Sequence, residues 1–568
     1  MFCRRQLFSD AFRSGGRLNR RLLSSTPNDI KPYYVTTPIF YPNAIPHIGH
    51  LYTIVTADIF ARYSRLTDPN RPVHFVTGTD EHGLKIQRVA HGSSRDPQAF
   101  CDLLSTNFRR LVKEADVSAT RFIRTTEIGH HRAAQHVWNI LKEKGLIYKG
   151  KHSGWYSVTD ECFYTNAQVA EISTSNNTLG GRYLSIETKS PVEWTMEENY
   201  MFRLTSFRDK LLEHIKSNPD FIYPPARYQE VLEFFDTYMQ DDLSISRPKS
   251  RLSWGIPVPE DPGHTMYVWF EALVNYLTAI EYPSPTTANG TTATWPPDLQ
   301  VMGKDIIRFH SLYFPAMLLA LDLPLPKRLL VHSHWTVEKR KMSKSVGNVV
   351  DPFEMMDAYG TDSVRYFLAR VGGRFKYDVD WSKGQFVKHS SELMSLVGNF
   401  YSRITAQKIK ELLGPSAIPT IVELQEAVLD GKQVQGSEIL LRLGGLRLRV
   451  QEHMRNLVVG DAIQEIVDVL ALANKIYSET QPWLPSTEPS QRAQIHAISV
   501  ETLRICGILL QPFIPGKSVE LLEALGTRPK ERFWDCAEPG KGTTRNLKQG
   551  VRLFIDPALV RKKPEPES

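Results

Sequence analysis

Apolar residues follow two different spacings in the first part of the chain. The run from Tyr33 to Tyr41 is aromatic and β-branched, as in a strand, and a turn rich in Pro and Asn follows it. The next apolar positions recur at helical spacing: Leu51, Ile54, Val55, Ile59 and Tyr63. A second strand-like run, Val73 to Gly78, ends at the polar segment Asp80 to Gly83 and enters another helical stretch. This alternation predicts a parallel α/β sheet.

The pattern changes between residues 145 and 257. Aromatic residues there stand among turn residues, and the Ser/Thr/Asn/Gly stretch from Ser173 to Gly181 is typical of a hairpin loop. The α/β pattern resumes with the run from Thr265 to Tyr276 and continues in two short apolar runs, Leu299 to Gly303 and Leu329 to Val331. We therefore predict one sheet domain that an inserted domain interrupts.

From about residue 390 onward the apolar positions are spaced as in helices. One stripe comprises Ile463, Ile466, Val467, Leu470, Asn474 and Tyr477, and a later one comprises Leu503, Ile505, Leu509 and Leu510. The last third of the chain is therefore predicted to be an α-helical bundle.

The composition narrows the class of protein. With 568 residues, 41% hydrophobic and 23% charged, the chain is long enough for several packed units, and no uninterrupted apolar stretch reaches bilayer length. We expect a multidomain globular protein without a membrane span. The five cysteines include no Cys-x-x-Cys pair and no Cys/His cluster at zinc spacing, so we expect reduced thiols and no structural metal.

Positive charge is concentrated at the start of the chain. The formal net charge is +7, and residues 1–28 contribute +5 of it, with six Arg against Asp10. Arginine is interspersed there with Leu and Phe, and Ser and Thr follow, which is typical of a mitochondrial transit peptide. We expect a presequence and a location in the mitochondrial matrix; a disordered basic arm that binds RNA is the alternative.

Two short motifs carry the candidate chemistry. Pro46 to His50 stands where the first strand gives way to the first helix, where free N–H groups favour phosphate. His47 and His50 can donate to that phosphate, and Gly49 permits close approach. Taken alone, a histidine at a helix start is more often a cap.

The second motif is Lys341-Met-Ser-Lys-Ser, followed by Val-Gly-Asn. Lys341 and Lys344 are spaced to hold one triphosphate or a leaving pyrophosphate, although a solvated basic turn would explain this string by itself. The two motifs in one split α/β domain are far more specific than either alone. Together they resemble class I aminoacyl-tRNA synthetases.

The stretches from Tyr267 to Tyr276 and from Gly303 to His310 are similar to those of methionyl-tRNA synthetases, and the likeness extends from Tyr33 to the C-terminal helices. This resemblance implies that Asp80 holds the α-ammonium of methionine. It further implies a methionine pocket formed by Ile39, Tyr41, Trp269, Ala272, Leu273, Tyr276, Ile306 and His310. Such side chains suit a polarizable thioether, although core packing would explain Trp269 and Tyr276 by spacing alone.

The resemblance also implies the reaction and its partners. Methionine would attack the α-phosphorus of ATP, supplied with Mg²⁺, and the methionyl group would pass to the terminal ribose 2′-hydroxyl of mitochondrial tRNA(Met). ATP would be held by His47, Gly49, His50, Lys341, Ser343 and Lys344, of which His47, His50, Lys341 and Lys344 serve catalysis. The positions that match the family's anticodon residues are Asn399, Arg403, Pro482 and Trp483.

Several features depart from the family pattern. Many relatives carry cysteine knuckles in the insertion, whereas only Cys162 stands there in this chain, so we expect no structural zinc. The segment His332 to Thr336 lacks the His-Gly pair frequent before the lysine loop, which leaves the adenine contacts open. No RNA-binding barrel follows the Leu553 to Ile555 stretch, so we expect a monomer.

The resemblance implies a Rossmann-like catalytic domain split by an insertion and followed by an anticodon-binding bundle. The expected segments are a presequence at 1–28, catalytic halves at 29–144 and 258–352, an inserted connective domain at 145–257, a stem region at 353–390 and the bundle at 391–568. Two alternatives remain. One is an inactive RNA-binding or splicing factor of the same fold; the other is a synthetase for another apolar amino acid, which usually needs a larger editing insertion.

Overall fold

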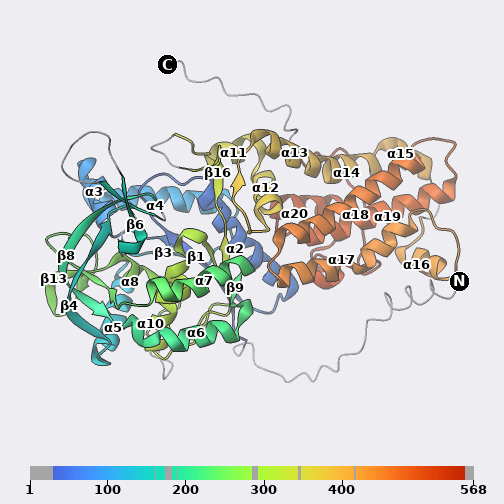
Figure 1. The fold of residues 1–568 in the computed structure, drawn as a ribbon. Helices are drawn as coiled ribbons and strands as arrows, with labels where there is room; N and C mark the ends of the chain where they lie inside the picture. The colour runs from blue at the N-terminus through green and yellow to red at the C-terminus, as the bar shows by residue number, and fades with distance from the viewer. Residues whose placement is uncertain are drawn as a thin grey trace, which may run out of the picture.

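The computed structural model describes residues 30–159, 162–164, 166–172, 182–186, 188–284, 292–342, 347–414, 418–554 and 556. The expected presequence, the expected hairpin loop from Ser173 to Gly181, and Ser343 and Lys344 of the second motif lie outside these residues. Within them, an α/β part and a helical bundle follow each other along one long axis (Figure 1).

A six-stranded parallel sheet forms the centre of the α/β part. Its strand order is β3 (Arg121–Arg124), β2 (Val73–Thr79), β1 (Tyr33–Phe40), β14 (Leu299–Gly303), β15 (Leu329–His332) and β9 (Ile222–Tyr223). Strands β1 and β14 are neighbours, with Val35 opposite Leu299, although the whole insertion separates them in sequence. This pairing confirms the predicted Rossmann-like sheet, which the insertion interrupts.

Alternating side chains of the sheet enter two hydrophobic cores. Val35 and Phe75 belong to the core under α2 (Ile48–Thr67) and α4 (Pro97–Glu114). Their neighbours Tyr34 and Val76 belong to the core formed with α5 (Ile128–Glu143) and α10 (Phe314–Ala320). The sheet is therefore covered on both faces, as parallel sheets require. Helix α3 (Leu84–Gly92) follows β2 and contacts α4.

The region between residues 145 and 257 contains an antiparallel sheet of the order β5 (Cys162–Tyr164), β4 (Ile147–Ser157), β8 (Pro191–Phe202), β7 (Arg182–Ser185) and β6 (Val169–Ile172), and β10 (Leu243–Ser244) pairs with β8. Helices α6 (Arg208–Ser217) and α7 (Pro225–Tyr238) follow. The short strand β9 between them joins the parallel sheet at β15, so this region also contributes to the main domain.

One run that was predicted to continue the parallel α/β pattern forms a strand of a different sheet. The run from Thr265 to Tyr276 begins in β13 (Asp261–Met266), which pairs antiparallel with β11 (Ser246–Pro248) and β12 (Pro257–Val258). The rest of the run forms the short helices α8 (Val268–Leu273) and α9 (Asn275–Thr278). After β13, the next strand of the parallel sheet is β14, which begins at Leu299, because β13 pairs with its antiparallel neighbours instead.

A linking region connects the sheet to the bundle. Strand β16 (Trp335–Val337) pairs with β17 (Arg340–Lys341) and β18 (Val379–Asp380). Helices α11 (Pro352–Tyr359) and α12 (Thr361–Gly372) follow, and α12 contacts both α2 and the bundle. Its buried Arg365 donates to Asp58 of α2 and to the carbonyls of Pro512 and Phe513 in the bundle.

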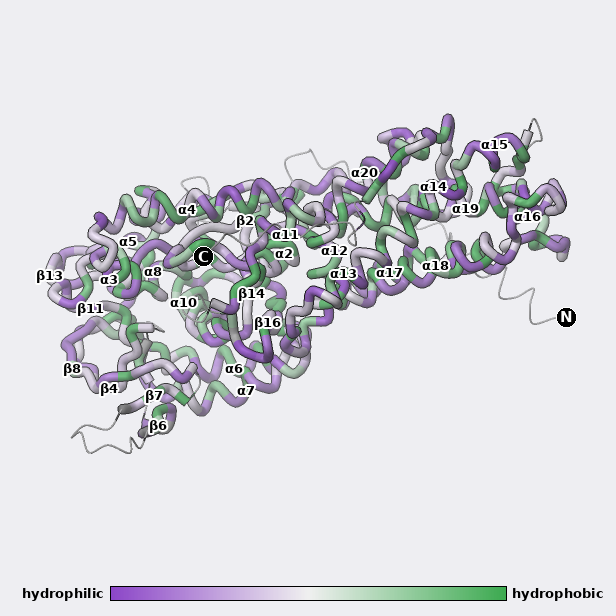
Figure 2. Tube along the Cα trace, turned by 90° about the horizontal axis from the view of Figure 1, so that it is seen from above, coloured by the Kyte–Doolittle hydropathy of each residue, from purple (hydrophilic) through white to green (hydrophobic). Residues whose placement is uncertain are grey.

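The bundle confirms the predicted helical C-terminal region. Its helices are α13 (Lys383–Leu393), α14 (Phe400–Ile404), α15 (Gln407–Leu413), α16 (Ile421–Leu429), α17 (Ser437–Arg455), α18 (Val459–Thr480), α19 (Pro489–Leu510) and α20 (Pro515–Ala524). Hydrophilic and hydrophobic positions alternate along them (Figure 2). Among the described residues, only α19 is long and apolar enough to cross a membrane, and most of its apolar stretch is buried inside the bundle.

Candidate active site

The first motif and Asp80 follow the carboxyl ends of neighbouring parallel strands. His47 follows β1 after a short turn, Asp80 directly follows β2, and Gly303 and His332 end β14 and β15. The chain proceeds from β1 to β2 on one side and from β14 to β15 on the other, so the order of strands reverses between β1 and β14. Ligands of open α/β sheets bind at this kind of switch point.

His47 and His50 form a capping box at the start of α2. Nδ1 of His47 accepts from the Gly49 N–H at 3.0 Å, and Nδ1 of His50 accepts from the His47 N–H at 3.0 Å. In the neutral rings the proton is therefore on Nε2. The ring centroids are 3.9 Å apart. Both histidines therefore cap the helix. This capping also fixes their two Nε2–H donors beside the helix N-terminus.

Gly49 is required by this arrangement. A Cβ atom at position 49 would lie 2.8 Å from Cε1 of His47, closer than two carbons can approach. Any larger residue would push the His47 ring away from the helix start. The small residue between the histidines therefore preserves the pair, in addition to leaving room for an anion.

A described segment that follows the second motif contacts the helix of the first. Lys341 ends strand β17, where it pairs with Thr336 of β16, and Met342 is buried. On the other side of the loop, the carbonyl of Val350 accepts the Ile48 N–H of the first turn of α2 at 3.1 Å. The segment that follows the lysine loop is thus joined to the helix end that carries His47 and His50.

The predicted methionine residues share one apolar cluster. Leu273 and Tyr276 are buried in it, and Ile39, Tyr41, Trp269 and Ile306 pack against it while remaining partly exposed. Ala272 and His310 are buried in the same segments. Six of the eight therefore belong to this cluster or pack against it, Ala272 and His310 lie in the same segments, and four of the side chains keep some exposed surface.

Sequence reasoning missed Phe309 in this cluster. Its ring stacks on the Trp269 indole with centroids 3.8 Å apart and planes 12° apart. Phe309 begins a π-helical turn, Phe309–Tyr313, a feature often found at functional sites. The only signal in the sequence was that Phe309 is an aromatic residue within the matched stretch from Gly303 to His310. That signal did not indicate that Trp269 would be its partner.

His310 is a neutral, buried group with a defined tautomer. Its Nδ1–H donates to the Ile306 carbonyl at 3.0 Å, so Nε2 accepts from the Tyr276 hydroxyl at 2.7 Å. Burial lowers the pKa of His310 to about 4, although the hydrogen bond to Ile306 opposes this shift. Tyr276 and His310 therefore present an oriented, uncharged polar pair within the apolar cluster.

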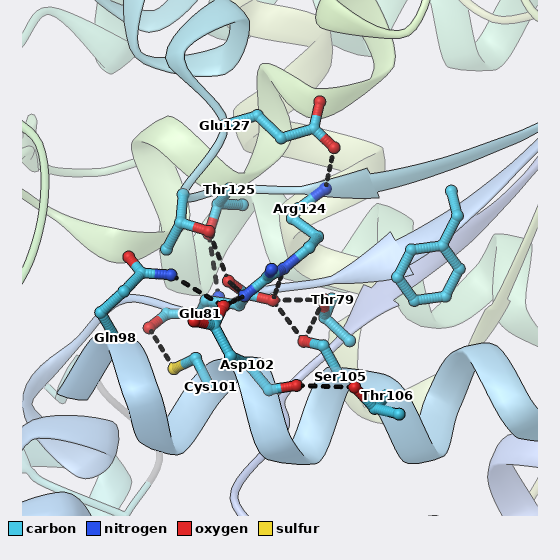
Figure 3. A network of polar contacts seen from close by, with 12 residues as sticks. Thr79, Glu81, Gln98, Cys101, Asp102, Ser105, Thr106, Arg124, Thr125 and Glu127 are labelled. Atoms are coloured by element: carbon cyan, nitrogen blue, oxygen red, sulfur yellow. Dashed lines mark hydrogen bonds and ion pairs between the residues drawn. The ribbon is translucent and has the colours of Figure 1, made fainter. Parts of the chain in front are cut away.

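Asp80 and Glu81 are adjacent carboxylates with different surroundings. Asp80 is 3% exposed, and its N–H donates to the Phe40 carbonyl, which ties the end of β2 to the end of β1. The Glu81 carboxylate accepts from Thr79 and Ser105 and from Nε and Nη2 of Arg124 (Figure 3). It also accepts from the Thr126 hydroxyl. Glu81 thus holds the loop that carries Asp80 against α4 and β3.

Two histidines, His332 and His334, lie in the segment whose adenine contacts the sequence left open. Nδ1 of His332 lies 2.9 Å from the Ser333 carbonyl and Nε2 lies 2.8 Å from the Thr53 hydroxyl of α2, so His332 joins β15 to α2. Its pKa is lowered to about 4, chiefly by burial. His334 lies half-buried next to it, with Nε2 3.1 Å from the Asp305 carboxylate.

The predicted anticodon residues meet on the bundle. The Arg403 guanidinium lies over the rings of Tyr477 and Trp483, at 5.1 and 5.5 Å from their centroids, and donates to Ser478. Trp483 is half-buried, Asn399 is exposed and Pro482 is buried. Asn399, Arg403 and Trp483 can therefore reach a ligand, whereas Pro482 shapes the turn behind them.

A separate cavity of about 290 Å³ lies between the antiparallel sheet and the turn that carries Phe309. Its walls include Phe163 and Trp194 of the sheet and the buried Arg247 and Arg308. The described residues that line it include none of the predicted methionine or ATP residues. Since the chemistry-bearing side chains converge at the sheet edge, the candidate active site lies there. No group of metal-ligating side chains occurs among the described residues.

Known proteins with similar sequences agree with this geometry. Residues 33–405 match the family described as tRNA synthetases class I (M), and residues 435–567 match the anticodon binding domain of methionyl tRNA ligase. The probable mitochondrial methionine–tRNA ligase of Neurospora crassa is 44% identical, with 90% of this chain and 83% of that protein covered. The mitochondrial methionine–tRNA ligase of Homo sapiens is 41% identical, with 89% and 85% covered.

A solved structure is similar over most of the chain. The Mycobacterium tuberculosis methionyl-tRNA synthetase bound by methionyl-adenylate superposes with a TM-score of 0.81 at 37% identity, with 92% of this chain and 100% of that chain covered. The resemblance inferred from the two motifs is thereby confirmed. This chain belongs to the methionyl-tRNA synthetase family of class I aminoacyl-tRNA synthetases.

Proposed function

We propose that this chain is a methionine–tRNA ligase that activates L-methionine with Mg-ATP and charges mitochondrial tRNA(Met) in the matrix. The observation that carries the proposal is the Val350–Ile48 hydrogen bond, which joins the segment after the lysine loop to the helix end bearing His47 and His50. In this proposal both phosphate-binding motifs act at one edge of the sheet, beside the aromatic cluster.

In this proposal the methionine side chain lies among Ile39, Tyr41, Trp269 and the Tyr276–His310 pair, and Asp80 binds the α-ammonium. A cation beside this buried carboxylate would offset the cost of burying its charge. The methionine carboxylate attacks the α-phosphorus of ATP, the bond to the β-phosphate oxygen breaks, and pyrophosphate leaves with that electron pair. Mg²⁺ arrives with ATP as part of the substrate.

His47, His50, Lys341 and Lys344 stabilise the phosphate charge in this step, with Gly49 and Ser343 close to the nucleotide. The Nε2–H groups of the two histidines and the N-terminus of α2 need no reorganisation, because the capping box already orients them. No side-chain nucleophile is needed. Positioning and electrostatics supply the catalysis.

The bundle binds the tRNA anticodon in this proposal. Trp483 stacks a base, and Asn399 and Arg403 read base edges, as unpaired RNA bases allow. The mitochondrial matrix and the mitochondrial tRNA are supported by the names of the relatives and by the Arg-rich start. A monomer without structural zinc and the segment boundaries at 28, 144, 257, 352 and 390 remain part of the proposal.

Amino-acid-dependent pyrophosphate exchange tests the activity. The purified chain should exchange pyrophosphate with methionine and not with Leu, Ile or Val, and should then charge a tRNA(Met) transcript. Exchange with another apolar amino acid would support the alternative specificity. No exchange with any amino acid, together with retained tRNA binding, would support the inactive RNA-binding factor. No observation favours either alternative.

A further inference from the structure

Behind the predicted methionine pocket lies a buried carboxylate that the mechanism above does not use. Glu271 of α8 is completely buried, and each of its oxygens accepts one histidine N–H: Oε1 from Nδ1 of His82 at 2.8 Å and Oε2 from Nε2 of His130 at 2.7 Å. We name Glu271, His82 and His130 the Glu271 clamp. Both acceptor positions of one carboxylate are thereby used to join distant parts of the chain.

The clamp connects the two catalytic halves. His82 follows β2 and His130 lies in the first turn of α5, both in the first half, whereas Glu271 belongs to the second half. Strand pairing between the halves runs through β1 and β14 at the sheet. The clamp adds a side-chain connection above the sheet, at the level of the predicted methionine residues.

Each side of the clamp carries predicted methionine contacts. On the Glu271 side, α8 also bears Trp269, Ala272 and Leu273. On the other side, the carbonyl of His82 accepts the Tyr41 hydroxyl at 2.6 Å, and Asp80 is two residues before His82. The clamp therefore fixes the distance between the ammonium-binding loop and the side-chain pocket.

The charges around the clamp keep it intact. Burial alone would raise the pKa of Glu271, but the adjacent His82 and His130 hold that pKa well below its usual range, so the carboxylate stays ionised. His131, whose ring is 5.4 Å from that of His82, has its pKa lowered to about 4 by burial. Nδ1 of His130 is 2.9 Å from the Thr278 hydroxyl, and the Trp254 indole makes a T-shaped contact with the His82 ring.

We propose that Glu271 is a positioning residue for methionine: it holds the Asp80–His82 loop against α8, so that one substrate can contact both. This inference rests on the proposed function. Among the described residues, the side-chain hydrogen bonds of the clamp run to Tyr41, to Thr278 and within the clamp, and none runs to α2. Loss of the clamp should therefore weaken methionine binding and leave the phosphate groups in place.

Two substitutions separate this role from simple packing. Glu271→Gln keeps the size of the side chain but replaces one acceptor by a donor and removes the charge. Glu271→Asp keeps the charge and both acceptors but is shorter and leaves a small cavity. If Glu271 only fills space, Glu271→Asp is the more harmful change; if it positions methionine, Glu271→Gln is.

The experiment measures pyrophosphate exchange by the full chain at varied methionine and varied ATP, together with the melting temperature. For Glu271→Gln we expect the KM for methionine to rise about tenfold, as the loss of a hydrogen bond to a charged group predicts, and the KM for ATP to change less than about twofold. Glu271→Asp should shift the KM for methionine less. Glu501→Gln, a buried carboxylate of the bundle paired with Arg504, is the matched control that should alter only the melting temperature.

Equal increases in both KM values, or wild-type values for Glu271→Gln, would overturn the inference. If Glu271→Gln does not fold, His130→Asn removes one donor and should shift the methionine KM in the same direction; an unchanged KM overturns the inference as well. A wild-type chain without methionine-dependent exchange defeats the proposed function before any variant is compared, and the two failures are thus distinguishable.

Discussion

The guanidinium of Arg365 donates a 2.7 Å hydrogen bond to the carboxylate of Asp58, and neither side chain has any exposed surface. Asp58 lies on α2, the helix that begins at the His47–His50 pair, and Arg365 lies on α12 next to the bundle. The ion pair therefore holds the proposed catalytic helix and the bundle in one relative position.

Asp58→Ala should destabilise the protein strongly, because it leaves the buried Arg365 cation without its carboxylate. We expect a loss of about 3–5 kcal/mol. Glu114→Ala, which breaks the exposed Arg110–Glu114 pair, is the control and should leave the free energy of unfolding nearly unchanged. Urea unfolding of both variants measures the difference, and similar losses would contradict the coupling role of the buried pair.

Stability should fall as the pH is lowered from 6.5 to 4. Burial lowers the pKa of His310 and of His496 from an ordinary 6.5 to about 4, so the unfolded chain takes up these protons first. The contribution of each neutral histidine to the free energy of unfolding is complete above pH 6.5 and is lost as the pH falls to 4, by on the order of 3 kcal/mol for each group. Denaturation at several pH values should show a shallower dependence for His496→Gln, while the exposed His91→Gln should keep the wild-type slope.

Lys344→Ala should leave methionine binding nearly unchanged and reduce adenylate formation about a hundredfold, because Lys344 acts on charge that develops after binding. Calorimetry measures the methionine affinity and pyrophosphate exchange measures the chemical step. Lys339→Ala, on the exposed turn between β16 and β17, is the neighbouring control. A wild-type exchange rate for Lys344→Ala would refute the phosphate role.

Trp483→Ala should weaken tRNA charging by about 1–3 kcal/mol, the worth of one stacked base, while pyrophosphate exchange stays near normal. The indole is only half-buried, and Arg403 covers part of it, so its removal leaves a small cavity. Trp534→Ala provides the comparison, since Trp534 is buried against Tyr63 of α2 and its loss should lower both activities and the melting temperature. The same pattern for Trp483→Ala would exclude the anticodon role.

Residues 1–28 fused to a fluorescent reporter should direct it to mitochondria, because their six Arg and interspersed Leu and Phe have the character of a transit peptide. Replacement of Arg4, Arg5, Arg13 and Arg17 by Gln is the matched control and should leave the reporter in the cytosol. Cytosolic fluorescence of the unaltered fusion would refute the targeting prediction.

Local patterns predicted the parts of the fold whose causes are local. Strand β14 occupies the predicted Leu299–Gly303, and the first histidine motif begins a helix as expected. The run at Thr265 was misplaced because strand pairing depends on distant partners, here Arg247 and Pro257. The Glu271 clamp and the Trp269–Phe309 stack were missed for the same reason: periodicity identifies a buried position but not the side chain that meets it.

Because β1 and β14 are far apart in the sequence, the site can form only after the chain has been synthesised beyond the insertion. A chain synthesised from its N-terminus contains β1, β2 and β3 once Arg124 has been added. The edge of β1 opposite β2 has no parallel neighbour until β14, which begins at Leu299, has been synthesised. Unpaired strand edges favour aggregation. Fragments that end within the insertion hold His47, His50 and Asp80 but none of Trp269, Tyr276 or the lysine loop. Such fragments should need a chaperone to stay dispersed, and nascent or truncated chains should bind neither substrate.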